Sequence, residues 1–210
     1  MTRSALPRIA LTLGDVAGIG PEVVVRAWND PRLQECCRPL VVGHPEVVRR
    51  AVRLLGMSFE VHSIGHSNEV FASGQSVPGV IHCWKPAGDE AALVPPGFND
   101  PRAGRAAYDC LAAATHAALA GDVEAITTAP LSKAALHLGG HDFPGHTEIL
   151  AQICGIKDFA MMLFLPIQSA KPQEAASTRR TGSAVTEGKD DVDCIKICHP
   201  INRCDGAGRL

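Results

Sequence analysis

Residues 8–28 read RIALTLGDVAGIGPEVVVRAW, and the expected fold follows from this stretch. Residues 8–13 form a short apolar run that favours a β-strand, and the run breaks into a segment with three glycines, 14–20. Pro21 then favours a helix start, because proline lacks only an N–H that has no partner in the first helical turn. The stretch therefore predicts a strand, a glycine loop and a helix in direct succession.

The same alternation of strand and helix signals continues as far as Pro166. We expect strands at 39–43, 58–64, 79–83, 123–127 and 159–165, and helices at 46–55, 104–120, 132–138 and 147–154. Strands that alternate with helices predict an α/β fold, with a mostly parallel sheet and helices on both of its faces. Beyond Pro166 the sequence is polar without an apolar period, so we expect a folded domain at 1–166 and a divergent, poorly ordered polar tail at 167–210.

Composition narrows the classes of function. The chain has 210 residues, a formal net charge of −2 and 46% hydrophobic residues, which suits one domain or slightly more. No basic stripe and no apolar run of about 18 residues occur, so we expect neither a nucleic-acid partner nor a membrane partner. The short polar N-terminus lacks a signal-peptide core, which predicts a cytoplasmic location and mostly reduced cysteines.

The glycine loop is the first candidate for chemistry. Gly14, Asp15 and Gly18 form a possible substrate-side loop, because glycines let the backbone approach a ligand and a helix N-terminus offers free N–H groups. The spacing matches neither the dinucleotide fingerprint nor a phosphate-binding P-loop. On these residues alone, an ordinary turn between strand and helix is the favoured explanation of the glycines.

A second candidate lies in residues 125–150. The expected strand ends in two threonines at the carboxyl edge of the sheet, where α/β proteins bind ligands. Lys133 follows at a helix start, either as a solvated surface lysine or as a charge directed at an anionic substrate. Thr147 is placed to N-cap the next helix, and a Pro-Gly bend displays His146 just before it, as an incidental residue or as a hydrogen-bonding group.

A third candidate lies near the C-terminus. Cys194, Cys198, His199 and Cys204 are four soft ligands in a short run, which is typical of a zinc site. The usual close pair of cysteines is missing and the surroundings are polar. These features favour an unstructured tail over metal binding.

Four motifs in this order resemble one enzyme family: TLGDVAGIGPEVVV, AITTAPLSKAAL, FPGHTEILAQ and MMLFLP. They are similar to the N-terminal half of 4-hydroxythreonine-4-phosphate dehydrogenase, of pyridoxal phosphate biosynthesis, over about residues 8–166. The resemblance implies a truncated fold like that of isocitrate and isopropylmalate dehydrogenases. It also implies an oxidoreductase that uses NAD or NADP and a divalent metal (zinc, magnesium or cobalt). Its substrate would be 4-phosphohydroxy-L-threonine or a related phosphorylated four-carbon acid, which is oxidised and decarboxylated.

The resemblance further implies a homodimer, and substrate contacts from His146 and Thr147. The family's metal-binding histidines and cofactor-binding groups lie beyond the point where this sequence leaves the pattern, so no metal, cofactor or catalytic residue is assigned here. Three hypotheses follow for the chain: a dehydrogenase, an inactive remnant or substrate-binding module, and a small metal-binding protein that uses the C-terminal cysteines.

Overall fold

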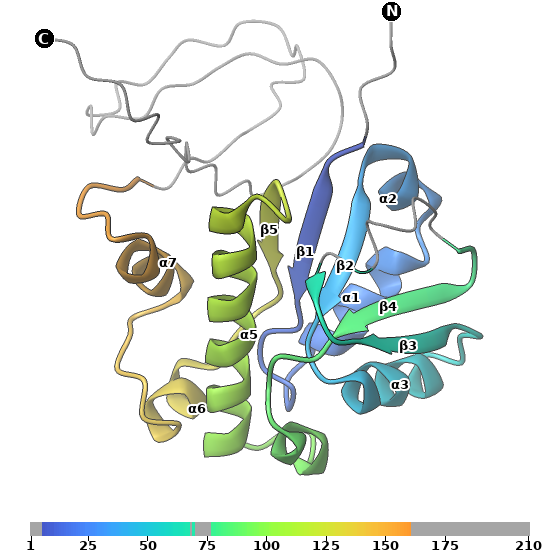
Figure 1. Ribbon diagram of the computed structural model, residues 1–210. Coiled ribbons are helices and arrows are strands. Elements are labelled where there is room, and N and C mark those ends of the chain that lie inside the picture. The colour runs from blue at the N-terminus through green and yellow to red at the C-terminus, as the bar shows by residue number, and fades with distance from the viewer. Residues whose placement is uncertain (1–5, 68, 70–76, 161–210) are drawn as a thin grey trace, which may run out of the picture. The chain divides into compact units, whose positions relative to one another are not determined.

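A parallel β-sheet with helices on both faces forms the core of the protein (Figure 1). The computed structural model describes residues 6–67, 69 and 77–160. The sheet has the order β3-β4-β2-β1-β5, and every neighbouring pair of strands is parallel. The strands are β1 (Arg8–Thr12), β2 (Arg38–Val42), β3 (Glu60–Ile64), β4 (Val80–Trp84) and β5 (Ala125–Thr128).

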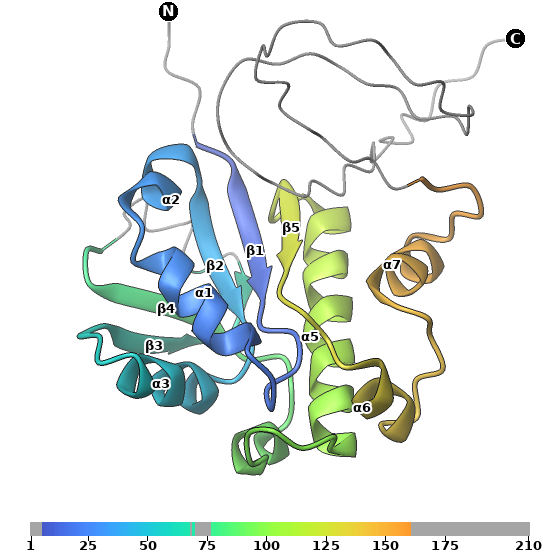
Figure 2. The ribbon, with the colours of Figure 1, turned by 180° about the vertical axis from the view of Figure 1, so that it is seen from behind.

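Helices cover the sheet on both sides (Figures 1 and 2). They are α1 (Gly20–Trp28), α2 (Pro31–Cys36), α3 (Pro45–Leu54), α5 (Pro101–Ala120), α6 (Lys133–Leu138) and α7 (His146–Cys154), with a 3₁₀ helix η1 (Asp89–Leu93). The central strand β1 shows the two layers. Ile9 and Leu11 pack in the core with α1 and α3, whereas Ala10 between them packs in the core with α5. The predicted α/β class and its two helical layers are confirmed.

The chain divides into two units, Met1–Lys157 and Asp158–Leu210, and the elements above all belong to the first. Most of the strand expected at 159–165 lies outside the described residues, and its first two residues, Phe159 and Ala160, are not in a strand. The expected boundary at Pro166, the polar tail and the C-terminal cysteine cluster lie outside the described residues as well.

Most of the α-helices start with a proline, a capping side chain or both. Proline is one of the first two residues of α1, α2, α3 and α5. Asp100 accepts a hydrogen bond from the Arg102 amide, so α5 begins at Pro101, three residues before the expected start. The sequence did not reveal α2, because this six-residue helix buries none of its residues and so has no apolar period.

Close backbone contact joins α5 to α6. A Cβ atom at Gly104 would lie 1.9 Å from the carbonyl oxygen of Ala135, so only glycine fits there. Leu111 of α5, Leu136 of α6 and Ile149 of α7 then share one small core. The three helices form a connected layer that carries the start of α7.

Gly104→Ala should destabilise the protein by about 1–3 kcal/mol, because the added methyl group must force the α5 and α6 backbones apart. Alanine normally favours a helix over glycine by about 1 kcal/mol, so a loss of stability points to the contact. Chemical denaturation measures the change. Gly88→Ala is the matched control, because nothing lies within 4 Å of a Cβ there, and its stability should stay equal or rise slightly.

Candidate functional site

The carboxyl ends of β1 and β5 form the natural place for a ligand. The loop after β1 leads to α1 on one face of the sheet, and the loop after β5 leads to α6, which packs on α5 at the other face. Neighbouring strands whose loops leave to opposite faces create the switch point at which open α/β sheets bind ligands. The glycine loop and the 125–150 segment therefore meet at the position that the topology favours.

Backbone groups hold these two loops together. The Ala129 amide donates to the Thr12 carbonyl at 3.0 Å, and the Asp15 amide donates to the Pro130 carbonyl at 2.9 Å. Gly14 has a φ of 63°, and a Cβ atom there would lie 2.2 Å from the Pro130 oxygen. This position therefore needs glycine for two reasons: its backbone is left-handed, and the second loop leaves no room for a Cβ atom.

The two other glycines of the loop differ in how closely neighbouring atoms approach them. A Cβ atom at Gly20 would lie 2.1 Å from the Leu13 oxygen, so this glycine lets α1 begin against the loop. Gly18 is exposed, and a Cβ there would meet only Asp15, at an ordinary 3.4 Å. The buried Asp15 carboxylate accepts a hydrogen bond from the Ala17 amide at 2.9 Å. Packing explains Gly14 and Gly20, but it leaves Gly18 free to face something outside the chain.

Arg50 of α3 holds the outer part of the glycine loop. Its guanidinium donates to the carbonyls of Val16 at 2.7 Å and of Val94 at 2.8 Å. The Gly97 amide donates to the Ala17 carbonyl at 2.8 Å. The sequence alone does not single out Arg50, because nothing in it distinguishes this residue from the two other arginines of the same helix.

The start of α7 corrects one expectation. The helix begins at His146, its N-cap is Gly145, and no side chain caps it. Thr147 is therefore the second helical residue, and its predicted role as N-cap is wrong. The reason is the extended backbone of Gly145, with a φ of 173°, which lets the helix begin one residue before the position expected for it.

His146 joins α7 to the loop after β5. Its half-buried ring hydrogen-bonds the backbone of Ala129, the residue that also bonds to the end of β1. Burial lowers the pKa of His146 below its usual value, and the hydrogen bond to Ala129 offsets part of that effect. The structure thus brings Gly14, Asp15 and His146 around the Ala129–Pro130 segment. Because its pKa is lowered, the imidazole of His146 is neutral near pH 7.

Lys133 stands apart from this cluster. It is the exposed first residue of α6, and it makes no hydrogen bond or ion pair with the described residues. The preceding Ser132 caps α6 and donates to the side-chain oxygen of Asn99 at 2.8 Å. The helix is therefore fixed, whereas the lysine ammonium is free to contact a ligand.

The described residues do not suggest a metal or cofactor site. They contain no group of three or more His, Cys, Asp or Glu side chains that could hold a metal ion. The Gly14, Gly18 and Gly20 spacing also differs from the loop that cradles a dinucleotide pyrophosphate. In the same part of the chain, no helix combines the length and apolar character that a membrane crossing needs.

Comparison with known proteins finds a matching family and several similar chains. The model of the family described as pyridoxal phosphate biosynthetic protein PdxA matches residues 35–168. A 4-hydroxythreonine-4-phosphate dehydrogenase of Trichlorobacter lovleyi is 36% identical over 157 residues, covering 75% of this chain and 46% of that protein. A D-threonate 4-phosphate dehydrogenase of Salmonella typhimurium is 40% identical over 156 residues, covering 74% of this chain and 46% of that protein.

A solved structure agrees with the sequence comparisons. The crystal structure of a 4-hydroxythreonine-4-phosphate dehydrogenase from Burkholderia phymatum superposes with a TM-score of 0.70 at 38% identity. The match covers 77% of this chain and 48% of that one. The chain spans about half the length of the relatives it matches.

The lowered pKa of His146 should make stability depend on pH. The unfolded chain binds the proton more readily, because its histidines have a pKa of about 6.5. The contribution of His146 is therefore present above about pH 6.5 and is lost as the pH falls through the folded-state pKa. Urea denaturation between about pH 8 and pH 5 should show a smaller loss of stability in His146→Gln than in the unaltered chain. Equal losses in both proteins would contradict this account.

Proposed function

The chain belongs to the family of pyridoxal phosphate biosynthetic protein PdxA, and from this premise we propose that it binds a phosphorylated four-carbon hydroxy acid at the carboxyl ends of β1 and β5. Two relatives are named for such substrates, 4-hydroxythreonine 4-phosphate and D-threonate 4-phosphate. Both substrates combine a phosphate, at least one free hydroxyl group and a carboxylate. The proposed reaction class is accordingly that of a dehydrogenase.

The placement of His146 carries the proposal. Its ring is held against Ala129, at the point where the two strand ends meet, and its pKa is lowered toward the neutral form. Because its one N–H donates to the Ala129 backbone, the neutral imidazole leaves its other nitrogen to accept a hydrogen bond from a substrate hydroxyl. Thr147, the next residue on α7, supplies a hydroxyl that can also hydrogen-bond a substrate.

Two further groups fit the anionic ends of such a substrate. Lys133 supplies a free cationic side chain at the start of α6, after the loop that follows β5. Gly18 presents exposed backbone beside Asp15. Together with Asp15, which shapes the loop from inside, these residues bind and orient the substrate.

The full dehydrogenase reaction requires groups beyond those in the described residues. NAD or NADP would accept the hydride, and a divalent metal such as zinc, magnesium or cobalt would polarise the alcohol. The described part of this chain offers no set of ligands for that metal. We therefore propose that these residues bind and orient the substrate. Oxidation, a homodimeric assembly and a cytoplasmic location are proposed for the whole enzyme.

A substrate-binding module without redox activity is the second candidate. It is favoured by the lack, among the described residues, of a group of side chains that could hold a metal ion. Formation of reduced nicotinamide from 4-phosphohydroxy-L-threonine or D-threonate 4-phosphate, with NAD or NADP and added divalent metal, separates the two. Turnover supports the dehydrogenase, and binding without turnover supports the module.

His146→Asn and Thr147→Val should each weaken binding of these substrates about tenfold to 100-fold, because each removes a hydrogen bond to a polar or charged ligand. Titration calorimetry on the unaltered chain and the variants measures the dissociation constants. The matched control is His62→Asn, since His62 is exposed on β3 at the opposite edge of the sheet. Unchanged affinity in both site variants, or no binding by the unaltered chain, would refute the proposed site.

Lys133→Ala should weaken binding about two- to fivefold at low salt, because an exposed ion pair contributes only modestly. The difference between this variant and the unaltered chain should shrink as salt is added, since salt screens exposed charges. Lys157→Ala, which removes another exposed lysine just after α7, serves as the control. If both lysine variants lose affinity equally, net charge is responsible and Lys133 has no specific role.

A further inference from the structure

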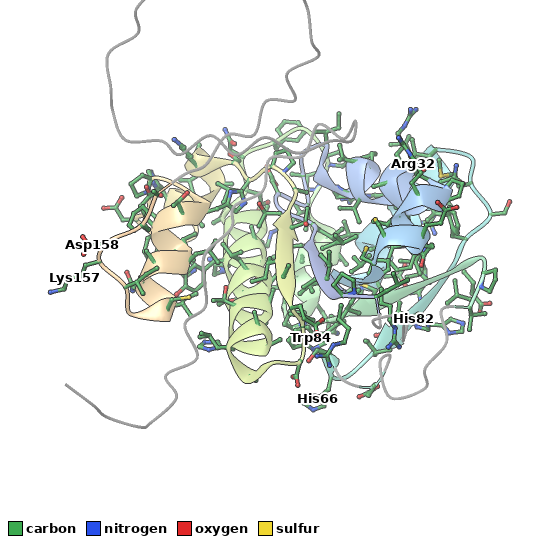
Figure 3. All side chains as sticks on the ribbon, turned by 90° about the horizontal axis from the view of Figure 1, so that it is seen from above. Arg32, His66, His82, Trp84, Lys157 and Asp158 are labelled. Carbon is green, nitrogen blue, oxygen red and sulfur yellow. The ribbon has the colours of Figure 1, made fainter. Side chains whose placement is uncertain are left out.

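Two adjacent cysteines end α2, remote from the proposed substrate site. Cys36 is the last residue of the helix, and Cys37 leads directly into β2. This is the amino end of β2, whereas the substrate site lies at the carboxyl ends of the strands. Figure 3 marks α2 by Arg32, whose side chain is largely exposed and points away from the sheet.

The two thiols converge on a single backbone oxygen. The sulfur atoms of Cys36 and Cys37 lie 3.5 Å and 3.3 Å from the Leu33 carbonyl oxygen, and the Cys37 amide donates to the same oxygen at 3.0 Å. The thiols are also close enough to hydrogen-bond each other. Burial, reinforced by Cys36, raises the pKa of Cys37 to about 12, so this side chain is a neutral thiol.

A disulfide between these neighbours does not suit their geometry. Consecutive Cα atoms are about 3.8 Å apart across a trans peptide, below the roughly 4.4–6.8 Å that disulfides span. A soft atom can instead bind both sulfurs, with bonds such as the roughly 2.3 Å of zinc to sulfur. The two sulfurs then stay farther apart than the roughly 2.05 Å of a disulfide bond. Chelation therefore relieves the constraint that disfavours oxidation.

We propose that Cys36 and Cys37 form a chelating dithiol site for trivalent, thiophilic metalloids of the organoarsenical class. The arsenic–oxygen bond of an arsine oxide breaks, two arsenic–sulfur bonds form, and the two thiol hydrogens leave with the oxygen as one water molecule. Arsenic stays trivalent, so no oxidant or reductant is needed. Because the thiol hydrogens depart with the oxygen, the neutral Cys37 thiol is no obstacle.

The local structure allows this reaction. Cys36 is exposed and can react first, after which Cys37 closes the ring. Cys37 is buried, but it lies at the extended C-cap of a helix that buries none of its residues. Turning its sulfur outward gives up the contact to the Leu33 oxygen and the burial of the Cys37 side chain, while that oxygen keeps the hydrogen bond from the Cys37 amide.

The remaining cysteines in the described part of the chain are less suited. Cys83 and Cys110 are both buried in the core, and burial raises the pKa of both thiols. Cys154 of α7 has no cysteine beside it in the sequence. Among the described residues, Cys36 and Cys37 are thus the adjacent pair, and Cys36 is its exposed member.

Phenylarsine oxide tests the proposal on the full chain carrying Cys194→Ser, Cys198→Ser and Cys204→Ser. Intact-mass measurement under native conditions should show one adduct per chain, which 2,3-dimercaptopropanol removes and 2-mercaptoethanol does not. Cys36→Ser should lower the apparent affinity at least about 100-fold, because the second bond no longer forms within the same molecule. Cys154→Ser, the matched control, should leave the affinity unchanged.

Two results would overturn the site: no dithiol-reversible adduct in this background, or an adduct of equal affinity in Cys36→Ser. Cys37→Ser should give the same loss as Cys36→Ser. Because Cys37 is buried, its variant is checked by thermal melting, and the exposed Cys36 decides the outcome if Cys37→Ser unfolds. Substrate binding should be unaffected by Cys36→Ser, so this test is independent of the proposed function.

Discussion

The backbone contact between the ends of β1 and β5 is the constraint on which the candidate site depends. The Asp15 amide bonds to the Pro130 carbonyl, and Gly14 leaves just enough space for that carbonyl to approach. The loops that follow these strands leave toward opposite faces of the sheet, and this contact fixes the place where they separate. Ala129 sits in the middle of it, because its amide bonds to β1 and its backbone bonds to the ring of His146. Residues of the candidate site from three parts of the chain are therefore tied to one short segment.

A second close backbone contact, between α5 and α6, supports the position of the candidate site. Gly104 brings the backbone of α5 against the backbone of α6, and small residues fill most of the buried face of α5. Few aromatic side chains are needed, since glycine and alanine let the helices approach closely. The position of His146 thus rests on the α5–α6–α7 layer as well as on its own hydrogen bond.

Local patterns predicted much of this fold. The apolar run before Gly14 and the proline at the start of α1 mark a strand and a helix regardless of what they pack against. By contrast, α2 has no buried face, and the helix start at His146 depends on the backbone angles of Gly145. The bonds of Arg50 to residues 34 and 44 positions away are properties of the tertiary structure. Family resemblance, rather than spacing, singled out His146 as a substrate ligand.

The order of the strands bears on how the chain folds during synthesis. β1 pairs with β2 about 30 residues later, but its other neighbour, β5, follows 116 positions along the chain, as in the pair Ile9–Ala125. A ribosome therefore releases four strands well before the fifth, and one side of the central strand waits until most of this unit has been made. Pairing across such sequence separation closes a large loop and is intrinsically slow. The candidate site, which includes the carboxyl end of β5, accordingly lies at the last part of the described sheet to be assembled.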